Sequence, residues 1–385
     1  MATLFDYLDW RGDLSFSQSG VCEVDNLIFS HICYLDFEGL IPNNFTKGIM
    51  YLTAMKRYKQ IHKGENNSLG LIFPPEVITL ATKAARSERF GRIRVAGHVN
   101  VINNTTQMQF SATTFLLDDD TCFVAFRGSD DTLIAWKENF NMSFMSPVPA
   151  QVRAVEYLEE AAAAYPDRQI YVGGHSKGGN LAVFAASKCS KQTKERLVAV
   201  YSNDGPGFTR KFIKSADYQE MRDKIRTLVP QSSVIGMLLE HEEGYEVVNS
   251  TQTGLYQHNG LSWEVKGRSF VHLDSITDES RKIDRTLKLW LSEMSYEKRQ
   301  RMTDTIYELL SSSTVKTLTD LNAEKLIVLK AWNTLNPEDK KLIKRLISLL
   351  VINTPKKKKD TQTDAKDQTN KNASKPKPRK ELNRK

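Results

Sequence analysis

The fold follows from one stretch of the sequence, Ile170-Tyr171-Val172-Gly173-Gly174-His175-Ser176-Lys177-Gly178-Gly179-Asn180-Leu181-Ala182. It begins with a short apolar, β-rich run and continues as an alanine-rich pattern of helical period through Cys189. This order predicts a strand, a sharp turn and a helix. A serine at such a turn is held in a strained backbone conformation that points its hydroxyl out over the end of a sheet. Ser176 is therefore our candidate nucleophile, at a nucleophile elbow.

Strands and helices alternate around this stretch. Strands are predicted at 94–101, 108–117, 121–126, 197–202 and 225–229, and helices at 26–40, 76–90, 151–165 and 211–224. Strands that alternate with helices favour a mostly parallel central sheet covered on both faces. With the elbow at its centre, this arrangement predicts an α/β-hydrolase fold.

The chain is expected to have three parts. Residues 1–274 form the α/β-hydrolase domain. Residues 275–354 form a C-terminal helical region, with helices predicted at 287–294, 296–310, 325–335 and 337–352. Residues 355–385 contain almost no apolar side chains that could offset the loss of chain entropy, so they are predicted to be a disordered Lys-rich tail.

Charge and cysteine content indicate the class of protein. The tail carries twelve Lys and Arg residues against four acidic ones, which accounts for the whole net charge of +8. No apolar run approaches the roughly 20 residues needed to span a bilayer, and Met1–Tyr7 does not resemble a signal peptide. These features favour a cytoplasmic protein. Its four scattered cysteines suggest neither a metal site nor disulfides and are interpreted as buried apolar residues.

A serine nucleophile needs an imidazole base, a carboxylate that orients the imidazole, and donors for the developing oxyanion. In α/β-hydrolases the chain order is serine, acid, histidine. Asp204 comes directly after the strand that should follow the elbow helix and is our candidate acid. The alternative is that its segment, Asp204-Gly205-Pro206-Gly207, is only a turn, to which aspartate is well suited.

Seven histidines compete for the role of base, and chain order favours His258, in a polar loop beyond the last predicted strand of the domain core. His272 is the reserve candidate, although it alternates like a strand residue. His175 adjoins the serine, where the side chain is expected to point away from the reacting centre. The other histidines precede the elbow or lie in an acidic segment, and they are His31, His62, His98 and His241.

The predicted oxyanion hole combines two segments. Ser129 follows a strand that ends in Phe-Arg-Gly, so its backbone N–H and hydroxyl could face Ser176. The second donor is the backbone N–H of Lys177, at the start of the elbow helix, where the helix dipole favours negative charge. Arg127 is interpreted as a partner in a structural salt bridge.

Two motifs resemble the class 3 triacylglycerol lipases. They are Val124-Ala125-Phe126-Arg127-Gly128-Ser129, followed by Trp136 and Phe140, and Gly173-Gly174-His175-Ser176-Lys177-Gly178-Gly179-Asn180. The segments Phe5–Asp13, Asp204–Phe208 and Gln257-His258 more closely resemble a bacterial lipase-like branch of unknown function. The resemblance implies a mobile segment at 130–136 that covers the serine and closes over an acyl chain. The alternative is that Leu133, Ile134 and Trp136 pack on the domain.

Two features of the sequence depart from the class 3 pattern. Those lipases usually carry their acid one strand later, where this chain has Leu228-Val229-Pro230-Gln231-Ser232-Ser233 and no carboxylate. Glu240 and Glu242 are the next acids if Asp204 is not the one. The residue after the nucleophile is Lys177 in place of the usual leucine, which keeps the backbone donor but is expected to change the wall of the site.

The sequence therefore predicts a serine hydrolase of carboxylic esters, lipid or acyl esters above all, with no cofactor and no metal. The rival hypothesis is a non-catalytic α/β-hydrolase-fold scaffold. In either case the basic tail is a candidate contact to an anionic membrane surface, with nucleic acid as a less favoured partner. The sequence does not indicate an oligomeric state.

Overall fold

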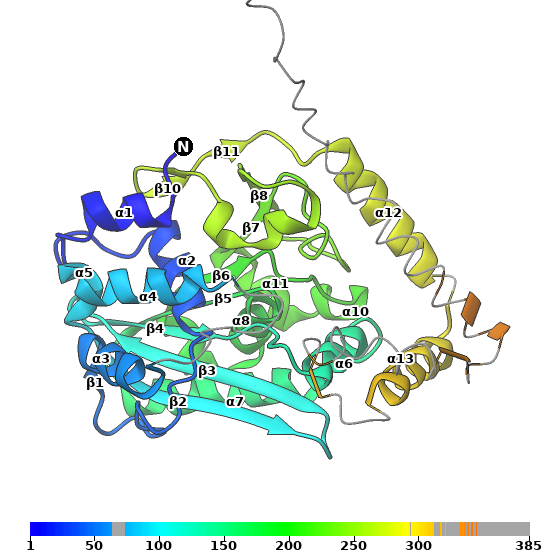
Figure 1. Cartoon of the computed structure of the whole chain (residues 1–385), viewed down its shortest axis with the longest axis horizontal. Coiled ribbons are helices and arrows are strands. Elements are labelled where there is room, and N and C mark those ends of the chain that lie inside the picture. Colours follow the sequence, from blue (N-terminus) through cyan, green and yellow to red (C-terminus); the bar gives the residue numbers. More distant parts are fainter. Residues whose placement is uncertain are drawn as a thin grey trace, which may run out of the picture. The chain divides into compact units, whose positions relative to one another are not determined.

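The computed structural model describes residues 1–63, 74–292 and 294–311, together with isolated positions between 316 and 344. Within these residues the main sheet has nine strands in the order β1-β2-β3-β4-β5-β6-β7-β8-β11 (Figure 1). The strands from β4 to β8 run parallel, as expected. Antiparallel strands flank them on both sides, so the sheet as a whole is mixed.

The predicted strands are all present. The main sheet consists of β1 (Ile49–Met50), β2 (Arg94–Asn103), β3 (Met108–Leu116), β4 (Thr121–Phe126), β5 (Gln169–His175), β6 (Leu197–Asn203), β7 (Ile225–Pro230), β8 (Tyr245–Val248) and β11 (His272–Leu273). A short hairpin pairs β9 (Val265–Lys266) with β10 (Ser269–Phe270).

Helices cover both faces of the sheet, as an α/β-hydrolase fold requires (Figure 1). One face carries α1 (Leu4–Arg11), α2 (Glu23–Ile32), α3 (Tyr51–Ile61), α4 (Glu76–Arg86) and α5 (Glu88–Gly91). The other carries α7 (Pro149–Ala164), α8 (Lys177–Lys188), α10 (Arg210–Ile213) and α11 (Ala216–Met221). The short α9 (Lys191–Arg196) leads into β6.

Strand β4 shows how the sequence specifies these two layers. Successive side chains of a strand point to opposite faces of a sheet. Phe123 and Ala125 accordingly pack in the core beneath α1–α5, whereas Val124 and Phe126 pack beneath α7 and α8. Because both faces are covered, the strand is apolar from Cys122 to Phe126 instead of alternating with polar residues. All four cysteines are free and buried, as predicted.

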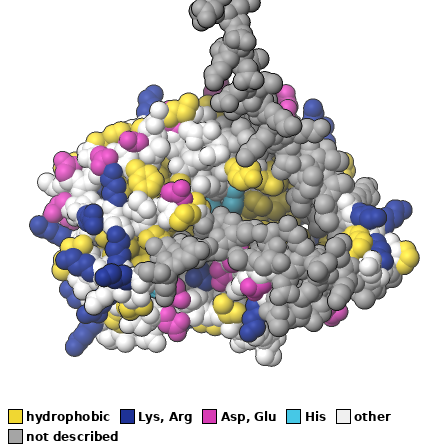
Figure 2. Space-filling view, viewed as in Figure 1, with side chains coloured by type: hydrophobic (Ala, Val, Ile, Leu, Met, Phe, Trp, Pro, Cys, Tyr) yellow, Lys and Arg dark blue, Asp and Glu magenta, His cyan; other side chains and the backbone are white. Residues whose placement is uncertain are grey.

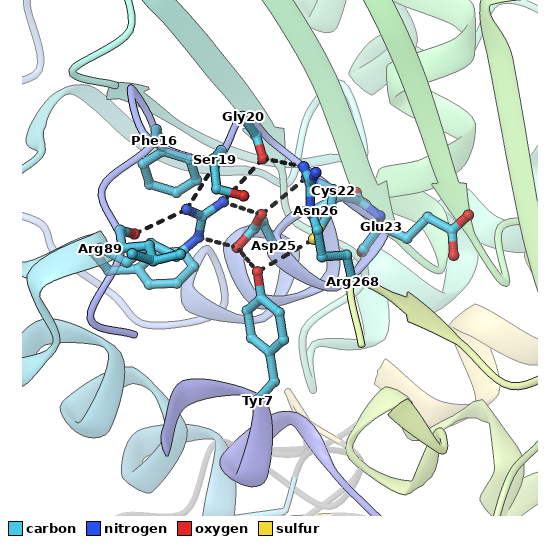
Figure 3. A network of polar contacts seen from close by, with 12 residues as sticks. Tyr7, Phe16, Ser19, Gly20, Cys22, Glu23, Asp25, Asn26, Arg89 and Arg268 are labelled. Carbon is cyan, nitrogen blue, oxygen red and sulfur yellow. Dashed lines mark hydrogen bonds and ion pairs between the residues drawn. The ribbon is translucent and has the colours of Figure 1, made fainter. Parts of the chain in front are cut away.

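The N-terminal helices are fixed by a buried ion pair (Figure 3). Arg89 donates from Nε and Nη2 to the two carboxylate oxygens of Asp25 at 2.7 and 2.6 Å. The Tyr7 hydroxyl donates to the same carboxylate at 2.8 Å. The guanidinium also donates to main-chain carbonyls of the loop between α1 and α2, including that of Ser19. This network ties α1, α2 and α5 together, so α2 has a defined position on the sheet.

The described part of the C-terminal region contains the helices α12 (Asp278–Ser292) and α13 (Tyr296–Ser311). Ile283 and Leu287 of α12 pack against Val234. Helix α13 contacts α6 (Leu133–Asn141) through an ion pair of 2.7 Å between Asp304 and Lys137. The helices predicted at 325–335 and 337–352 lie outside the described residues apart from isolated positions, and so does the whole tail.

Membrane-spanning helices were not expected from the sequence. In the described ranges, none of the helices is both long and apolar enough to cross a bilayer.

Candidate active site

Ser176 stands at the sharp turn between β5 and α8, where the sequence placed it. Its backbone has φ 58° and ψ −131°, in the left-handed region that costs energy for a residue with a side chain. The turn is possible because the chain segments pass very close together. A Cβ atom on Gly174 would lie 2.3 Å from the carbonyl carbon of Gly178, and one on Gly178 would lie 2.1 Å from the carbonyl oxygen of Phe126. The two glycines of the elbow motif therefore let β4, β5 and α8 meet at the serine.

Asp204 and His258 lie together although they are 54 residues apart. His258 Nδ1 is 2.6 Å from Asp204 Oδ2. An ionised carboxylate only accepts hydrogen bonds, so Nδ1 carries the proton and donates it to Asp204. Neutral His258 then has its lone pair on Nε2. This is the tautomer that a histidine needs to act as a general base.

Asp204 is fully buried and follows β6 with a positive φ of 49°. Its second oxygen, Oδ1, accepts hydrogen bonds from the Ser233 hydroxyl and from the Gly236 backbone N–H, the latter at 3.1 Å. Both donors follow β7, which is the position where class 3 lipases usually carry the acid. Here the candidate acid stands one strand earlier, and the loop after β7 supplies donors that hold its carboxylate.

The loop that carries His258 is also fixed. His258 ends a 3-10 turn, Gly254–His258. The preceding residue, Gln257, accepts two hydrogen bonds. The Trp263 indole N–H donates to its backbone carbonyl oxygen at 2.9 Å, and the Ser232 backbone N–H donates to its side-chain oxygen at 2.8 Å. The His258 side chain remains 19% exposed, in contrast to its carboxylate partner. The histidine is thus both oriented and accessible.

Ser129 follows β4, the strand that pairs with β5, by three residues. Its hydroxyl oxygen accepts a hydrogen bond of 2.7 Å from Asn139 Nδ2 on α6, which leaves the hydroxyl proton available for donation. The preceding Gly128 is pressed against the elbow, because a Cβ atom there would lie 2.6 Å from the carbonyl oxygen of His175. The segment that carries Ser129 and the elbow that carries Ser176 are therefore in direct contact.

Lys177 opens α8, and its backbone N–H lies at the positive end of that helix. The sequence had suggested that its side chain changes the wall of the site. Instead, the side chain is buried away from it. The ammonium is buried 3.0 Å from Glu138 Oε2 and donates to the carbonyl oxygen and the side-chain oxygen of Gln109 at 2.6 Å each. A long side chain can reach these acceptors, whereas the leucine usual at this position could not bond them.

Other residues of the motifs have structural partners. Arg127 donates to Asp130 at 3.0 Å, as expected, and to Asn100 at 2.9 Å. The segment 130–136 contains the start of α6, in which Leu133 and Ile134 are buried and Trp136 is partly buried. This arrangement agrees with packing on the domain, the alternative to a mobile cover.

Sequence reasoning missed two histidines of the site. The ring of His175 was expected to point away, but its centroid lies 4.5 Å from that of His258, and its Nε2 is 2.7 Å from the His258 carbonyl oxygen. The ring of His31, from α2, lies 5.3 Å from that of His175. Burial, and then the charge of His258, lower the pKa of both, to about 3 for His31. His31 and His175 are 144 positions apart in the sequence, and no local pattern indicates that their side chains meet.

The reserve base, His272, belongs to a different cluster. Its two ring nitrogens lie 3.1 Å from Glu23 and 3.2 Å from Glu246. Among the described residues these three could offer ligand atoms to a metal ion. All three are at least partly exposed, and the pairing of the imidazole with two carboxylates accounts for their proximity. We assign no metal to them.

Comparisons with solved structures found fungal lipases. The Rhizomucor miehei lipase–propeptide complex is 18% identical with a TM-score of 0.31, and the match covers 42% of this chain and 57% of that one. Lipase II from Rhizopus niveus is 14% identical with a TM-score of 0.34, over 68% and 91%. A triacylglycerol lipase from Penicillium expansum is 13% identical with a TM-score of 0.32, over 49% and 76%.

This chain thus spans little more than half the length of the Rhizomucor structure. These TM-scores are too low to establish a shared fold by superposition, so the fold class rests on the sheet order and the elbow described above. No curated protein matched the chain. A family model did match, over residues 84–308, which are more than half of the sequence. The lipase-like family predicted from the motifs is confirmed in this form: the chain belongs to the Mbeg1-like family.

Proposed function

We propose that this protein is a serine hydrolase of carboxylic esters, with Ser176 as nucleophile, His258 as base and Asp204 as the acid that orients the base. One observation carries the proposal. Asp204 and His258 form a pair 2.6 Å apart, and the ring of His258 lies 4.5 Å from that of His175, the residue before the serine whose backbone is strained into the elbow conformation. Chain order, tautomer and backbone strain all fit nucleophilic catalysis.

The proposed reaction follows from these positions. His258 Nε2 takes the proton of the Ser176 hydroxyl as the serine attacks the ester carbonyl, and the resulting imidazolium is stabilised by Asp204. The carbonyl oxygen becomes negative and is bound by the N–H of Lys177 and by the N–H and hydroxyl of Ser129. The imidazolium then protonates the leaving alkoxide, which gives an acyl-enzyme. Water, activated by His258, hydrolyses it and releases the acid.

An acyl or lipid ester is the substrate class that we propose. Near the middle of one face, histidine atoms are visible at the surface next to hydrophobic side chains (Figure 2). Two apolar residues just before the base, Leu255 and Tyr256, are exposed to solvent. Apolar surface beside a reacting centre favours a substrate with a hydrocarbon portion. The proposed reaction requires no cofactor and no metal.

A fluorophosphonate probe tests the proposal directly, because it reacts covalently with an activated serine. The intact protein should become labelled at one residue, identified as Ser176 by peptide mass spectrometry, and Ser176→Ala should not be labelled. Hydrolysis of p-nitrophenyl butyrate should fall by about 10⁴-fold or more in the same variant. A folded wild-type protein without labelling or turnover would instead support the non-catalytic scaffold.

We also propose that the protein is cytoplasmic and that its tail, residues 355–385, binds anionic membrane surfaces. Each Lys or Arg close to an acidic membrane contributes roughly 1 kcal/mol. Removing residues 355–385 should weaken co-sedimentation with phosphatidylserine vesicles and leave turnover of a soluble ester unchanged. Equal vesicle binding with and without the tail would remove this part of the proposal. Retention of the full-length protein on nucleic acid but not on vesicles would identify the other partner.

A further inference from the structure

A chain of hydrogen bonds runs from the N-terminal segment to the backbone of the proposed base. We infer that Tyr34 and His175 are positioning residues: His175 holds the main chain of His258, and Tyr34 fixes the tautomer of His175 that can do so. The inference rests on the proposed function, since it concerns how the base of that site is oriented. It assigns a role to a segment that lies outside residues 84–308, the part matched by the family model.

The tautomer of His175 follows from its partners. Nε2 lies 2.7 Å from the carbonyl oxygen of His258, which can only accept, so Nε2 carries the proton. The ring is fully buried, and burial holds its pKa well below 6.5, so it is neutral and Nδ1 has a lone pair. The Tyr34 hydroxyl lies 3.2 Å from Nδ1 and 3.3 Å from the carbonyl oxygen of His175, and it donates its one proton to these two acceptors. With this donor in place, the proton of the imidazole is directed to Nε2 and hence to His258.

Tyr34 also contacts the segment that carries Ser129, a proposed oxyanion donor. Its hydroxyl lies 3.3 Å from the carbonyl oxygen of His175, the residue before the nucleophile. A Cβ atom on Gly128, the residue before Ser129, would lie only 2.0 Å from the same hydroxyl. One tyrosine therefore contacts both the elbow and the end of β4, and reaches the base loop through His175.

The segment that supplies Tyr34 is rigidly held. Tyr34 follows α2 by two residues, and α2 is anchored by the buried pair of Asp25 and Arg89. The same helix bonds the residue before the acid, because Asn26 and Asn203 exchange side-chain hydrogen bonds of 2.8 and 3.0 Å. Because Tyr34 is anchored in this way, it can hold His175, and through His175 the main chain of His258, in a fixed position.

The neutral state of His175 also suits the proposed reaction. Its ring lies 4.5 Å from the ring that becomes an imidazolium in the transition state. A second positive charge at that distance would oppose the one that develops on His258, whereas a neutral ring that donates to the His258 carbonyl does not.

The first test compares two substitutions of His175. Gln can donate from a nitrogen in nearly the place of Nε2, whereas Met fills a similar volume and cannot donate. His175→Met should lower kcat for p-nitrophenyl butyrate about 100-fold, the cost of misplacing a catalytic group by about 1 Å. KM and the thermal unfolding temperature should change little, and His175→Gln should recover most of the rate. Equal losses in the two variants would overturn the inference.

The second test is a double-mutant cycle with Tyr34→Phe, which removes only the hydroxyl. Alone it should lower kcat about three- to tenfold, the effect of one hydrogen bond. In the His175→Met background it should lower kcat no further, because the hydrogen bond from His175 to the main chain of His258 is already lost. Tyr51→Phe is the matched control, since Tyr51 is equally buried and donates a single hydrogen bond of 3.0 Å to Ala81. Fully additive losses would show that Tyr34 does not act through His175.

A third readout does not depend on turnover. The proton between His258 Nδ1 and Asp204 should give a far-downfield NMR resonance, sharp in the wild type and in His175→Gln, and broadened or lost in His175→Met. If the wild-type protein hydrolyses no ester but this signal depends on His175, the proposed function fails and the positioning inference stands. If the protein hydrolyses esters and neither kcat nor the signal responds to His175→Met, the inference fails and the function stands.

Discussion

Lys177 Nζ lies 3.0 Å from Glu138 Oε2, and the side chains of both residues are almost completely buried. Glu138 also accepts from the backbone N–H groups of Gln109, at 3.2 Å, and Ala150, at 2.9 Å. The pair joins α6 to the first turn of α8, beside the proposed nucleophile. Because Asn139, next to Glu138, bonds Ser129, helix α6 contacts both segments that supply the proposed oxyanion donors.

Breaking this ion pair should destabilise the protein strongly. Lys177→Met leaves the Glu138 carboxylate buried without a counter-charge, so the free energy of unfolding should fall by about 3–5 kcal/mol. Urea denaturation measures the change. In the double variant Glu138→Gln/Lys177→Met the loss should be smaller than the sum of the two single losses, because no uncompensated charge remains.

An exposed pair provides the control for that measurement. Lys188 and Asp217 are 2.6 Å apart, but both side chains are more than a third exposed. Lys188→Met should therefore change the free energy of unfolding by only about 0–1 kcal/mol. Similar losses for Lys177→Met and Lys188→Met would show that the Glu138 pair is not the buried constraint described here.

The local sequence was sufficient to predict the central sheet and the elbow. The strands β2 to β7 and the turn at Ser176 each have a signal within a few residues, either a period of two or the glycines of the elbow motif. The pair of Asp204 and His258 was also predictable, because the order of strands brings the loops after β6 and β8 to the same end of the sheet. Chain order is therefore informative about sites at strand ends.

The surroundings of the site could not be predicted in the same way. The Lys177 ammonium is placed by residues on β3 and α6, and the rings of His31 and His175 meet only because α2 packs on the sheet near the elbow. Such contacts depend on tertiary packing between segments far apart in the chain. A buried lysine and a structural histidine have no period or motif of their own, so the sequence pattern did not predict the partners of either side chain.

The proposed acid should be needed for turnover. In Asp204→Asn the amide oxygen can keep the hydrogen bonds from Ser233 and Gly236, which places the NH2 group opposite His258 Nδ1. A donor at that position favours the wrong His258 tautomer, so kcat for p-nitrophenyl butyrate should fall by up to about 10⁴-fold with the fold intact. Ser233→Ala removes one donor to Asp204 and should have a smaller effect, about three- to tenfold. An unchanged rate in Asp204→Asn would redirect the search to Glu240 and Glu242. Full activity in His258→Ala, with loss in His272→Ala, would instead reassign the base.

The buried His31 should make the folded protein sensitive to acid. Both of its ring nitrogens are buried and have no hydrogen-bond partner among the described residues, and burial lowers its pKa from 6.5 to about 3. Between these two values the unfolded chain binds a proton at this residue that the folded protein does not bind. The free energy of unfolding should therefore fall as the pH is lowered, by up to about 1.4 kcal/mol per pH unit from this residue alone.

A comparison with His31→Leu isolates this contribution from other titrating groups. At pH 8 the difference in unfolding free energy between the two proteins reports only packing. As the pH falls below 6.5 the variant should lose stability less steeply than the wild type, measured by urea denaturation at each pH. Parallel curves for the two proteins from pH 8 to pH 4 would contradict a neutral, buried His31.

The dependence of the rate on ester chain length tests whether Leu133 and Ile134 of helix α6 contact the acyl chain of the substrate. Each CH₂ of an acyl chain that becomes buried adds about 0.8 kcal/mol, so rate constants on p-nitrophenyl esters should rise from acetate to octanoate. Leu133 and Ile134 are buried in α6, which is held by Glu138 and Lys137. Leu133→Ala and Ile134→Ala should therefore lower stability by about 2–5 kcal/mol and lower the rates on short and long esters by the same factor. Val152→Ala, at an exposed position on α7, is the control and should change neither property.

If the two α6 variants instead lose activity on octanoate while keeping it on acetate, these side chains line a pocket for the acyl chain and α6 acts as its cover. A steep preference of the wild-type protein for acetate would replace the lipid ester with a small ester, and the roles of Ser176, His258 and Asp204 would be unaffected.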